Sequence, residues 1–407
     1  MNDVWSDYAR KREAALAVAA PLAAVAAPMP DPAAIPPRAW LYGTRLIRRF
    51  VSVLVAPGGV GKSALALGQS VAVATGRPIL GEHVHHAANV WVLNLEDPAE
   101  ETHRRLAACM HHHAISRDAL DGRLYLHCGR DRRVTMGELD AYGNVVKHPD
   151  REAVAEAARG QNIGLIVVDP FVKSHRLDEN SNAQIDAAAT AWAEVAELTG
   201  AAVLLVHHVR KGAPADIEAA RGAKALTDAA RSAAILAPMS EAEATEMGVA
   251  PGERWRHIRL DDAKANLAPR AETALWYRLE TVVLGNGTPD YPNGDHVAVV
   301  TPWKRPHAPV APSDETLRQA LGQIARGPGG GMAYCAQRGG SSNARWAGHV
   351  LVRICTMSER DAARQIGAWL KSGVLTECDY RDRQQRKQRR GLRVADDLVA
   401  QASVREP

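Results

Sequence analysis

The segment from residue 51 to residue 74 constrains the fold more than any other part of the sequence. It opens with an apolar run, continues through a turn with three glycines and leads into an alanine-rich stretch. Apolar runs that alternate with helical stretches are typical of a parallel sheet covered by helices on both faces. Further runs of this kind follow at residues 89–95, 124–128, 163–168, 201–206 and 233–236. The sequence therefore predicts an α/β fold with a mostly parallel sheet.

Later apolar runs differ, because turn residues rather than helices separate them. These runs span residues 255–260, 274–283 and 296–300. Short runs joined by turns favour antiparallel strands, so we expect an antiparallel extension of the same sheet. A proline-rich stretch then predicts a domain boundary. The predicted organisation is a tail at 1–38, a main domain at 39–302, a hinge at 303–312, a small domain at 313–400 and a tail at 401–407.

The glycine turn has the pattern of a phosphate-binding loop. Its backbone N–H groups can surround phosphate oxygens, and the start of the next helix adds a partial positive charge. Lys62 is expected to reach the β- and γ-phosphates of ATP, and the hydroxyl of Ser63 is expected to bind Mg²⁺. The first glycine of the usual pattern is replaced by alanine. The predicted nucleotide contacts are Ala56, Pro57, Gly58, Gly59, Val60, Gly61, Lys62, Ser63 and Ala64.

Carboxylates follow two other apolar runs. Asp169 ends the run at 163–168, and the carboxyl ends of parallel strands meet at one edge of a sheet, so it is expected to hold Mg²⁺ together with Ser63. Glu96 and Asp97 end the run at 89–95. ATP hydrolysis needs a group that orients or deprotonates water, and we assign this role to Glu96. Asp97 is expected mainly to cap the helix that begins at Pro98.

His207 and His208 follow the run at 201–206. One of the pair is expected to contact the γ-phosphate and to report its presence to the next loop. Zinc binding is the alternative, although no cysteine or acidic ligand lies at a matching spacing.

Charge and cysteine content narrow the class of protein. The 407 residues carry a net charge of +4, too small to indicate a polyanion partner by itself. Five cysteines without a Cys-x-x-Cys pair favour a reducing, cytoplasmic location. The alanine-rich stretch at 14–27 is broken by Pro21, and we expect neither a membrane anchor nor a membrane partner.

The C-terminal region predicts three helices followed by two strands around a basic tip, which resembles a winged helix. The third helix, with Arg360, Arg364 and Gln365, is expected to enter a major groove of duplex DNA. Arg386 and Lys387 at the tip are expected to contact phosphates. The alternatives are contacts with proteins, or a basic run that is merely solvated.

Together these motifs resemble the RecA-like hexameric helicases of the plasmid RepA type, within the AAA_25 ATPases of phages and mobile elements. The resemblance covers about residues 38–285. It is carried by APGGVGKS (56–63), LEDP (95–98), VVDP (167–170), LLVHH (204–208), ARGAKALTDAARSA (220–233) and DDAKANLAP (261–269).

The resemblance implies roles for individual residues. Glu96 would be the catalytic glutamate, Asp169 the Walker B carboxylate, and the two histidines a sensor pair. Arg231 would be an arginine finger that reaches a neighbour's nucleotide, with Arg221 and Lys224 as lesser candidates. Arg105 would be an active-site arginine, and Lys264 would touch nucleotide across the subunit boundary.

The loop after the histidine run is expected to face a central channel. Its Arg210 and Lys211 would bind single-stranded DNA, or belong to an ordinary basic surface loop. The predicted function is an ATP-dependent DNA helicase that works as a homo-hexamer in replication. The alternatives are an ATPase that binds DNA without unwinding it, such as a loader, recombination mediator or partition-type regulator, or a nucleotide-switched replication regulator.

Overall fold

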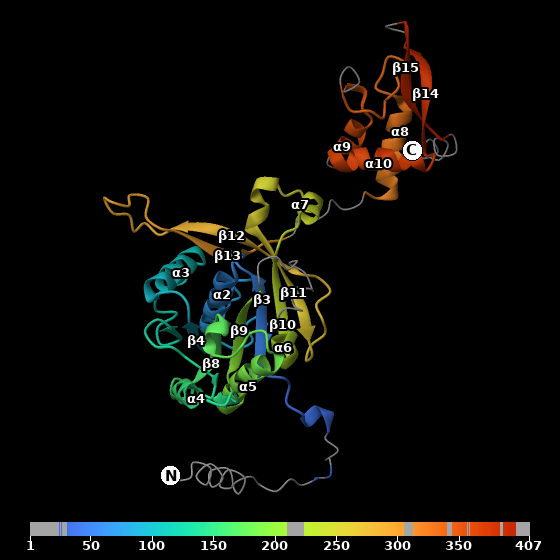
Figure 1. Cartoon of the computed structure of the whole chain (residues 1–407). Coiled ribbons are helices and arrows are strands. Elements are labelled where there is room, and N and C mark those ends of the chain that lie inside the picture. Colours follow the sequence, from blue (N-terminus) through green and yellow to red (C-terminus); the bar gives the residue numbers. More distant parts are fainter. Residues whose placement is uncertain are drawn as a thin grey trace, which may run out of the picture. The chain divides into compact units, whose positions relative to one another are not determined.

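A computed structural model describes the chain over residues 31–209, 224–304, 312–339, 344–355, 359–382 and 386–395, with Ala24, Ala26 and Met357. The chain divides into two compact units (Figure 1). The first contains residues 1–238 and 255–302, and the second contains residues 239–254 and 303–407.

A nine-stranded sheet forms the centre of the first unit. Its strand order is β13-β12-β11-β10-β3-β9-β8-β4-β5. The strands from β10 to β5 pair in parallel, and the pairs β10–β11, β11–β12 and β12–β13 are antiparallel. The parallel strands are β3 (Val51–Pro57), β4 (Asn89–Asn94), β5 (Leu124–Cys128), β8 (Ile163–Asp169), β9 (Ala202–Val209) and β10 (Ser232–Pro238). The extension is β11 (His257–Ala265), β12 (Leu275–Val283) and β13 (His296–Pro302). The predicted mostly parallel sheet with an antiparallel extension is confirmed.

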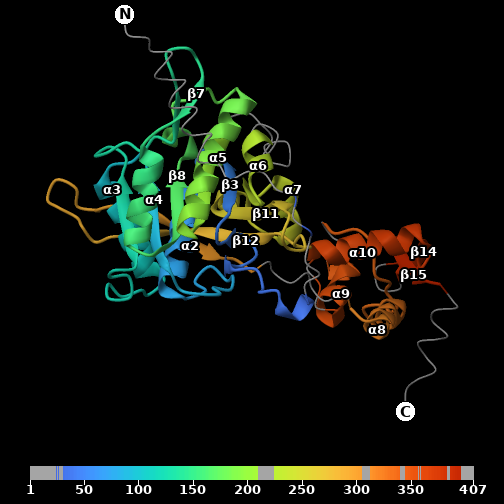
Figure 2. The same ribbon diagram turned by 90° about the horizontal axis from the view of Figure 1, so that it is seen from below.

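Helices cover both faces of this sheet (Figures 1 and 2). On one face lie α2 (Lys62–Thr75) and α3 (Ala99–His112), and on the other lie α4 (Asp150–Gly160), α5 (Asn182–Thr199) and α6 (Lys224–Ala229). Successive strand residues point to opposite faces. In β9, Leu204 and Val206 pack with the α2 side, whereas Val203 and Leu205 pack with the α5 side. The parallel strands are therefore mostly apolar, as the sequence predicts.

Shorter elements complete the first unit. They are η1 (Pro32–Ala34), β1 (Trp40–Tyr42), β2 (Leu46–Ile47), β6 (Gly137–Leu139), β7 (Val145–Lys147), η2 (Phe171–Ser174) and η4 (Pro251–Arg256), whose last two residues belong to this unit. Arg45 forms buried ion pairs with Glu82 and, at 3.0 Å, with Asp262 of β11. This network ties the β1–β2 turn to the antiparallel part of the sheet.

The second unit contains three longer helices and a two-stranded hairpin. They are α8 (Asp314–Arg326), α9 (Gly348–Cys355), α10 (Glu359–Lys371), β14 (Leu375–Asp382) and β15 (Lys387–Val394), and the unit also includes α7 (Glu241–Met247). A core around Trp346, Leu351 and Ile366 joins these helices to the hairpin. The order of elements matches the sequence-based expectation, and the winged-helix assignment stays a prediction.

In the described part of the chain, no helix has the length and apolar character needed to cross a bilayer.

Candidate nucleotide-binding site

The phosphate-binding loop connects the carboxyl end of β3 to α2. Gly59 and Gly61 have φ angles of +82° and +89°, which a residue with a side chain rarely adopts. A Cβ atom on Gly61 would also lie 2.8 Å from the side chain of Leu279 in β12. Gly58 and Gly59 face open space, so their backbone groups are accessible to a ligand. The loop therefore has the backbone that phosphate binding requires.

Two opposite charges are held beside this loop without full solvation. Lys62 is 6% exposed, and burial lowers the pKa of its ammonium group against the attraction of Asp169 and Glu96. Burial raises the pKa of Asp169, while a hydrogen bond with Ser63 and the charge of Lys62 oppose that shift. A bound phosphate would stabilise the charged form of Lys62. A bound divalent cation would stabilise the charged form of Asp169. The donor set of Ser63 and Asp169 therefore fits Mg²⁺, which prefers oxygen ligands.

Glu96 lies beyond the end of β4, where a turn presents it at the edge of the sheet. The buried side chain of Asn94 builds this turn, because its Oδ1 accepts hydrogen bonds from the backbone N–H groups of Glu96 (3.1 Å) and Asp97 (2.9 Å). Its Nδ2 donates to Thr102 of α3 at 2.9 Å. The charge of Glu96 acts on both Lys62 and His208. The exposed carboxylate of Glu96 is thus close to the phosphate loop, and Asn94 is a positioning residue that the sequence analysis missed.

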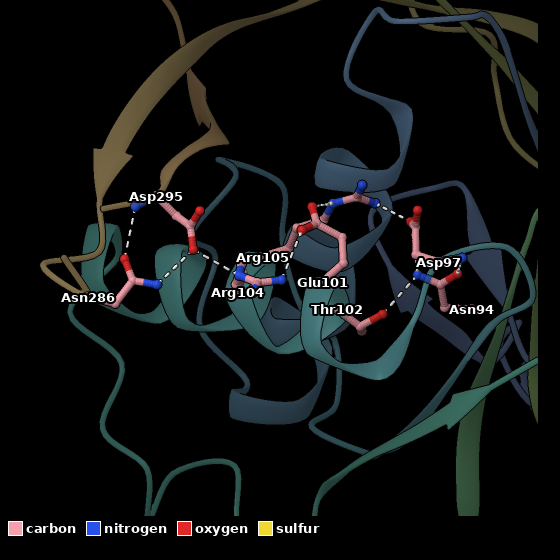
Figure 3. Close-up of polar contacts among 8 residues, drawn as sticks. All are labelled: Asn94, Asp97, Glu101, Thr102, Arg104, Arg105, Asn286 and Asp295. Atoms are coloured by element: carbon pink, nitrogen blue, oxygen red, sulfur yellow. Dashed lines mark hydrogen bonds and ion pairs between the residues drawn. The ribbon is translucent and has the colours of Figure 1, made fainter. Parts of the chain in front are cut away.

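The predicted helix cap at Asp97 is wrong. Pro98 is the N-cap of α3, which begins at Ala99 and has no side-chain cap. Asp97 instead accepts a hydrogen bond from Nη1 of Arg105 at 2.7 Å, and Glu101 accepts one from Nε of Arg105 at 3.0 Å (Figure 3). The carboxylate of Asp97 is therefore engaged by a charged partner on α3 and does not cap the helix.

Arg105 therefore faces the nucleotide site of its own chain. It lines a small pocket with Ser63 and Asp169, and its charge acts on Lys62. Two carboxylates hold the guanidinium beside the loop, where Arg105 lines a pocket together with Gly59, Lys62 and Ser63.

A larger pocket of about 370 Å³ extends from the loop toward the β12–β13 hairpin. Lys62, Ser63 and Arg105 line it together with Arg104, Asp295 and His296. Asp295 accepts hydrogen bonds from Arg104 at 2.8 Å and from Asn286 at 2.7 Å, which joins the hairpin to α3 (Figure 3). The sequence carries no signal for this wall, because Arg104 and Asp295 lie 191 residues apart.

The two histidines do not act as a pair on one face. Strand β9 extends to Val209, so His207 and His208 point to opposite faces of the sheet. His208 lies on the α2 side, where burial and the charge of Lys62 lower its pKa and Glu96 opposes the shift. His207 is buried on the other face, near Phe171 and His175. Only His208 lies near the phosphate loop.

The burial of His207 predicts that the stability of the protein depends on pH. Burial lowers the pKa of His207 to about 4 and that of His175 to about 4, against about 6.5 in an unfolded chain. Below pH 6.5 the unfolded chain binds more protons, so the free energy of unfolding falls as the pH falls toward 4, by up to about 3 kcal/mol per histidine. Denaturant unfolding at several pH values should show this loss of stability. In His207→Asn the free energy of unfolding should fall less steeply with falling pH than in the wild type. Substitution of the exposed His86 by Asn should leave the slope unchanged. Equal slopes for all three chains would contradict the assignment.

Arg231 and Lys264 lie at the opposite end of the sheet from the phosphate loop. Arg231 is exposed, and its backbone N–H donates to Val51 at the start of β3 (3.1 Å). The ammonium of Lys264 donates to the carbonyls of Thr227 and Asp228 at the end of α6, at 3.0 and 2.8 Å. Neither residue is brought to the nucleotide site of its own chain. Lys224 begins α6, and Arg221 lies outside the described residues.

The predicted DNA-binding residues are partly described. Arg210 and Lys211 lie outside the described residues, as does the side chain of Arg360 on α10. Arg364 on α10 is exposed and pairs with Asp361 at 3.4 Å. Arg386 and Lys387 are exposed at the start of β15.

Comparison with known proteins finds a family match within the first unit. A family model described as an AAA domain, AAA_25, matches residues 21–214, just under half of the chain. Among solved structures, a DnaB-like replicative helicase, described with its interactions with primase, is 13% identical with a TM-score of 0.41. That match covers 56% of this chain and 55% of the helicase, so the chain spans about half the helicase's length. The flagellar accessory protein FlaH from Methanocaldococcus jannaschii is 13% identical with a TM-score of 0.38, covering 57% of this chain and 86% of FlaH. Residues 21–214 are therefore similar to an AAA domain of the AAA_25 type, which supports a P-loop ATPase.

Proposed function

We propose that this ATPase is a ring-forming DNA motor that hydrolyses ATP at its subunit boundaries and separates DNA strands. The observation that carries the proposal is the position of Arg231. Ser232 pairs with Ser52, five residues before the end of β3 at Pro57. Five residues of a parallel strand span roughly 17 Å, longer than an arginine side chain. Arg231 can therefore act on ATP only if the nucleotide belongs to a neighbouring subunit.

Within one subunit, the residues divide the work of hydrolysis. The loop N–H groups and Lys62 bind the phosphates, and Ser63 and Asp169 hold Mg²⁺, which neutralises charge on the phosphate oxygens when it is bound. Glu96 accepts a proton from the attacking water or orients it. We expect His208 to sense the γ-phosphate, since the charges of Lys62 and Glu96 both act on it.

Coupling to DNA follows from chain order. The segment 210–223, which lies outside the described residues, begins two positions after His208 and carries Arg210 and Lys211. We expect this segment to bind the backbone of single-stranded DNA. Loss of the γ-phosphate would then change its affinity for the strand. The exposed Arg364, Arg386 and Lys387 support a second contact with duplex DNA.

Arg105 favours a second candidate function. Because it lies beside Ser63 and Asp169 of its own chain, it can supply a cation without a neighbour. A chain that uses Arg105 in this way would be a DNA-binding ATPase or a nucleotide-switched regulator that does not unwind DNA.

One set of assays separates the two functions. We expect the purified protein to form a closed oligomer with Mg²⁺ and ATP, to hydrolyse ATP faster with single-stranded DNA, and to release the labelled strand of a forked duplex. Lys62→Ala serves as the control for contaminating ATPases. A monomeric protein whose hydrolysis ignores DNA would contradict the motor. DNA-stimulated hydrolysis without strand release would favour the second candidate.

A further inference from the structure

The second unit contains a charged pocket that the ATPase site does not use. Its volume is about 390 Å³, and residues from the loop before α9 and from both strands of the hairpin line it. Arg345, Arg389, Arg390 and Glu377 supply its charged groups.

Arg345 is the unusual member of this set. It is only 8% exposed, and its Nη1 donates to the carbonyl of Ala333 at 3.1 Å and to the hydroxyl of Tyr380 at 2.8 Å. Its Nε is buried and has no hydrogen-bond partner. Among the residues that the structure describes, no carboxylate forms an ion pair with Arg345, although both other arginines have one.

The neighbouring charges are already balanced. Arg389 pairs with the buried Asp382 at 3.2 Å, and Arg390 pairs with Glu377 at 3.6 Å. Outside the described residues, the segment 340–343 before Arg345 and the segment 383–385 before Arg389 contain no aspartate or glutamate. An arginine stays charged at any ordinary pH, and a buried charge is costly without a counterion. The pocket therefore has an excess positive charge at Arg345.

The guanidinium can also donate to an anion. Both hydrogen bonds to described residues use Nη1 and Nε is buried, so Nη2 is the nitrogen left to donate. An N–H group of a charged guanidinium makes a strong hydrogen bond to an oxygen of a phosphate or carboxylate. Backbone hydrogen bonds fix the segments that line the pocket. The N–H of Cys335 donates to the carbonyl of Arg345 at 2.8 Å, and the N–H of Leu392 donates to the carbonyl of Tyr334 at 2.7 Å. The pocket is preformed.

We propose that this pocket binds a phosphate group, and that a nucleic-acid strand lying along the β14–β15 hairpin supplies it. The exposed Arg386 and Lys387 extend the positive surface along β15. A strand offers successive phosphates, whereas a carboxylate ligand would leave these two cations unused. The inference rests on the proposed function only in taking DNA as the source, since a free phosphate has the same chemistry.

The test uses the full chain without ATP and measures binding of labelled 20-nucleotide single-stranded and duplex DNA by fluorescence anisotropy at several salt concentrations. Arg345→Gln should weaken binding about ten-fold and reduce the slope of log affinity against log salt by about one. Arg345→Lys should lie in between, because it keeps the charge and loses the planar guanidinium. Arg318→Gln, at an exposed position on α8, should bind as the wild type does.

A second variant protects the test against misfolding. Glu377 is exposed, so Glu377→Gln should fold normally, and it should tighten binding because it removes the carboxylate from the pocket. Thermal unfolding and DNA-free ATP hydrolysis of each variant report whether both units are intact.

The outcomes separate this inference from the proposed function. If the wild type binds DNA and the Arg345 and Glu377 variants match it in affinity and salt slope, the inference is overturned and the DNA motor stands. If the wild type binds no DNA, the strand as source is overturned. Inorganic phosphate is then titrated against the Lys62→Ala chain, whose phosphate loop is disabled. Thermal stabilisation that Arg345→Gln removes would identify free phosphate as the ligand, and no stabilisation would overturn the pocket itself.

Discussion

Replacing Arg231 by alanine is expected to lower the rate of ATP hydrolysis by about 10³–10⁵-fold, the range for an arginine that stabilises phosphoryl transfer from a neighbouring subunit. The chain should still fold, bind ATP and assemble, because the side chain is exposed and the hydrogen bonds of Arg231 to the described residues Val51 and Asn266 use its backbone. Steady-state hydrolysis, nucleotide binding and particle mass measure the three properties. Arg159→Ala, at an exposed position on α4, is the matched control and should have wild-type activity.

Mixing two inactive chains tests whether the action crosses the subunit boundary. Lys62→Ala keeps Arg231, and Arg231→Ala keeps its own phosphate loop. In a random equal mixture, about a quarter of the boundaries combine an intact loop with an intact arginine, so activity should return to about that fraction of the wild type. If Arg231 acted within its own chain, no mixture would recover activity. Recovery together with full activity of Arg105→Ala would exclude the second candidate.

The substitution Glu96→Gln is expected to lower the rate of hydrolysis by about 10²–10⁴-fold while ATP binding is kept. The amide has nearly the same shape and cannot accept the proton of the attacking water. Single-turnover hydrolysis and equilibrium binding of ATP separate the two effects. Glu100→Gln, at an exposed position in the first turn of α3, removes the same charge nearby and should have little effect.

The support of Glu96 gives a second way to check its role. Asn94→Ala removes both hydrogen bonds to the turn that carries Glu96, so it should also slow hydrolysis, although less than Glu96→Gln. An unchanged rate in Glu96→Gln would mean that another carboxylate, with Asp97 the nearest candidate, acts on the water.

Much of the site could be predicted because its signals are local. The glycines at 59 and 61 adopt the left-handed conformation that the loop pattern implies, and the helix follows directly at Lys62. Asp169 and Glu96 follow apolar runs, and parallel strands bring their carboxyl ends to one edge. The prediction of a mostly parallel sheet was correct for the same reason, since strands buried on both faces need continuous apolar runs.

The structure differs from the sequence-based predictions at Asp97 and at the two histidines, because contacts with other elements determine where these side chains lie. Asp97 has a residue type and position suited to a helix cap, yet Arg105 two turns along α3 offers it a charged partner. The sequence-based prediction put both histidines at the end of this strand and treated them as a sensor pair. Pairing with β3 extends β9 to Val209, and the alternation of side chains then separates His207 from His208.

The sequence by itself determined the α/β fold class, the phosphate loop and the two carboxylates at the sheet edge, because each depends on residue types that are close together in the chain. Only the tertiary structure decided which distant side chains share a site. Arg104 meets Asp295 across 191 residues, Leu279 packs over Gly61, Arg231 lies at the far end of its own sheet, and Arg345 is buried beside two arginines of the hairpin. These contacts depend on strand register and on the packing of separate elements, and no local pattern in the sequence encodes them.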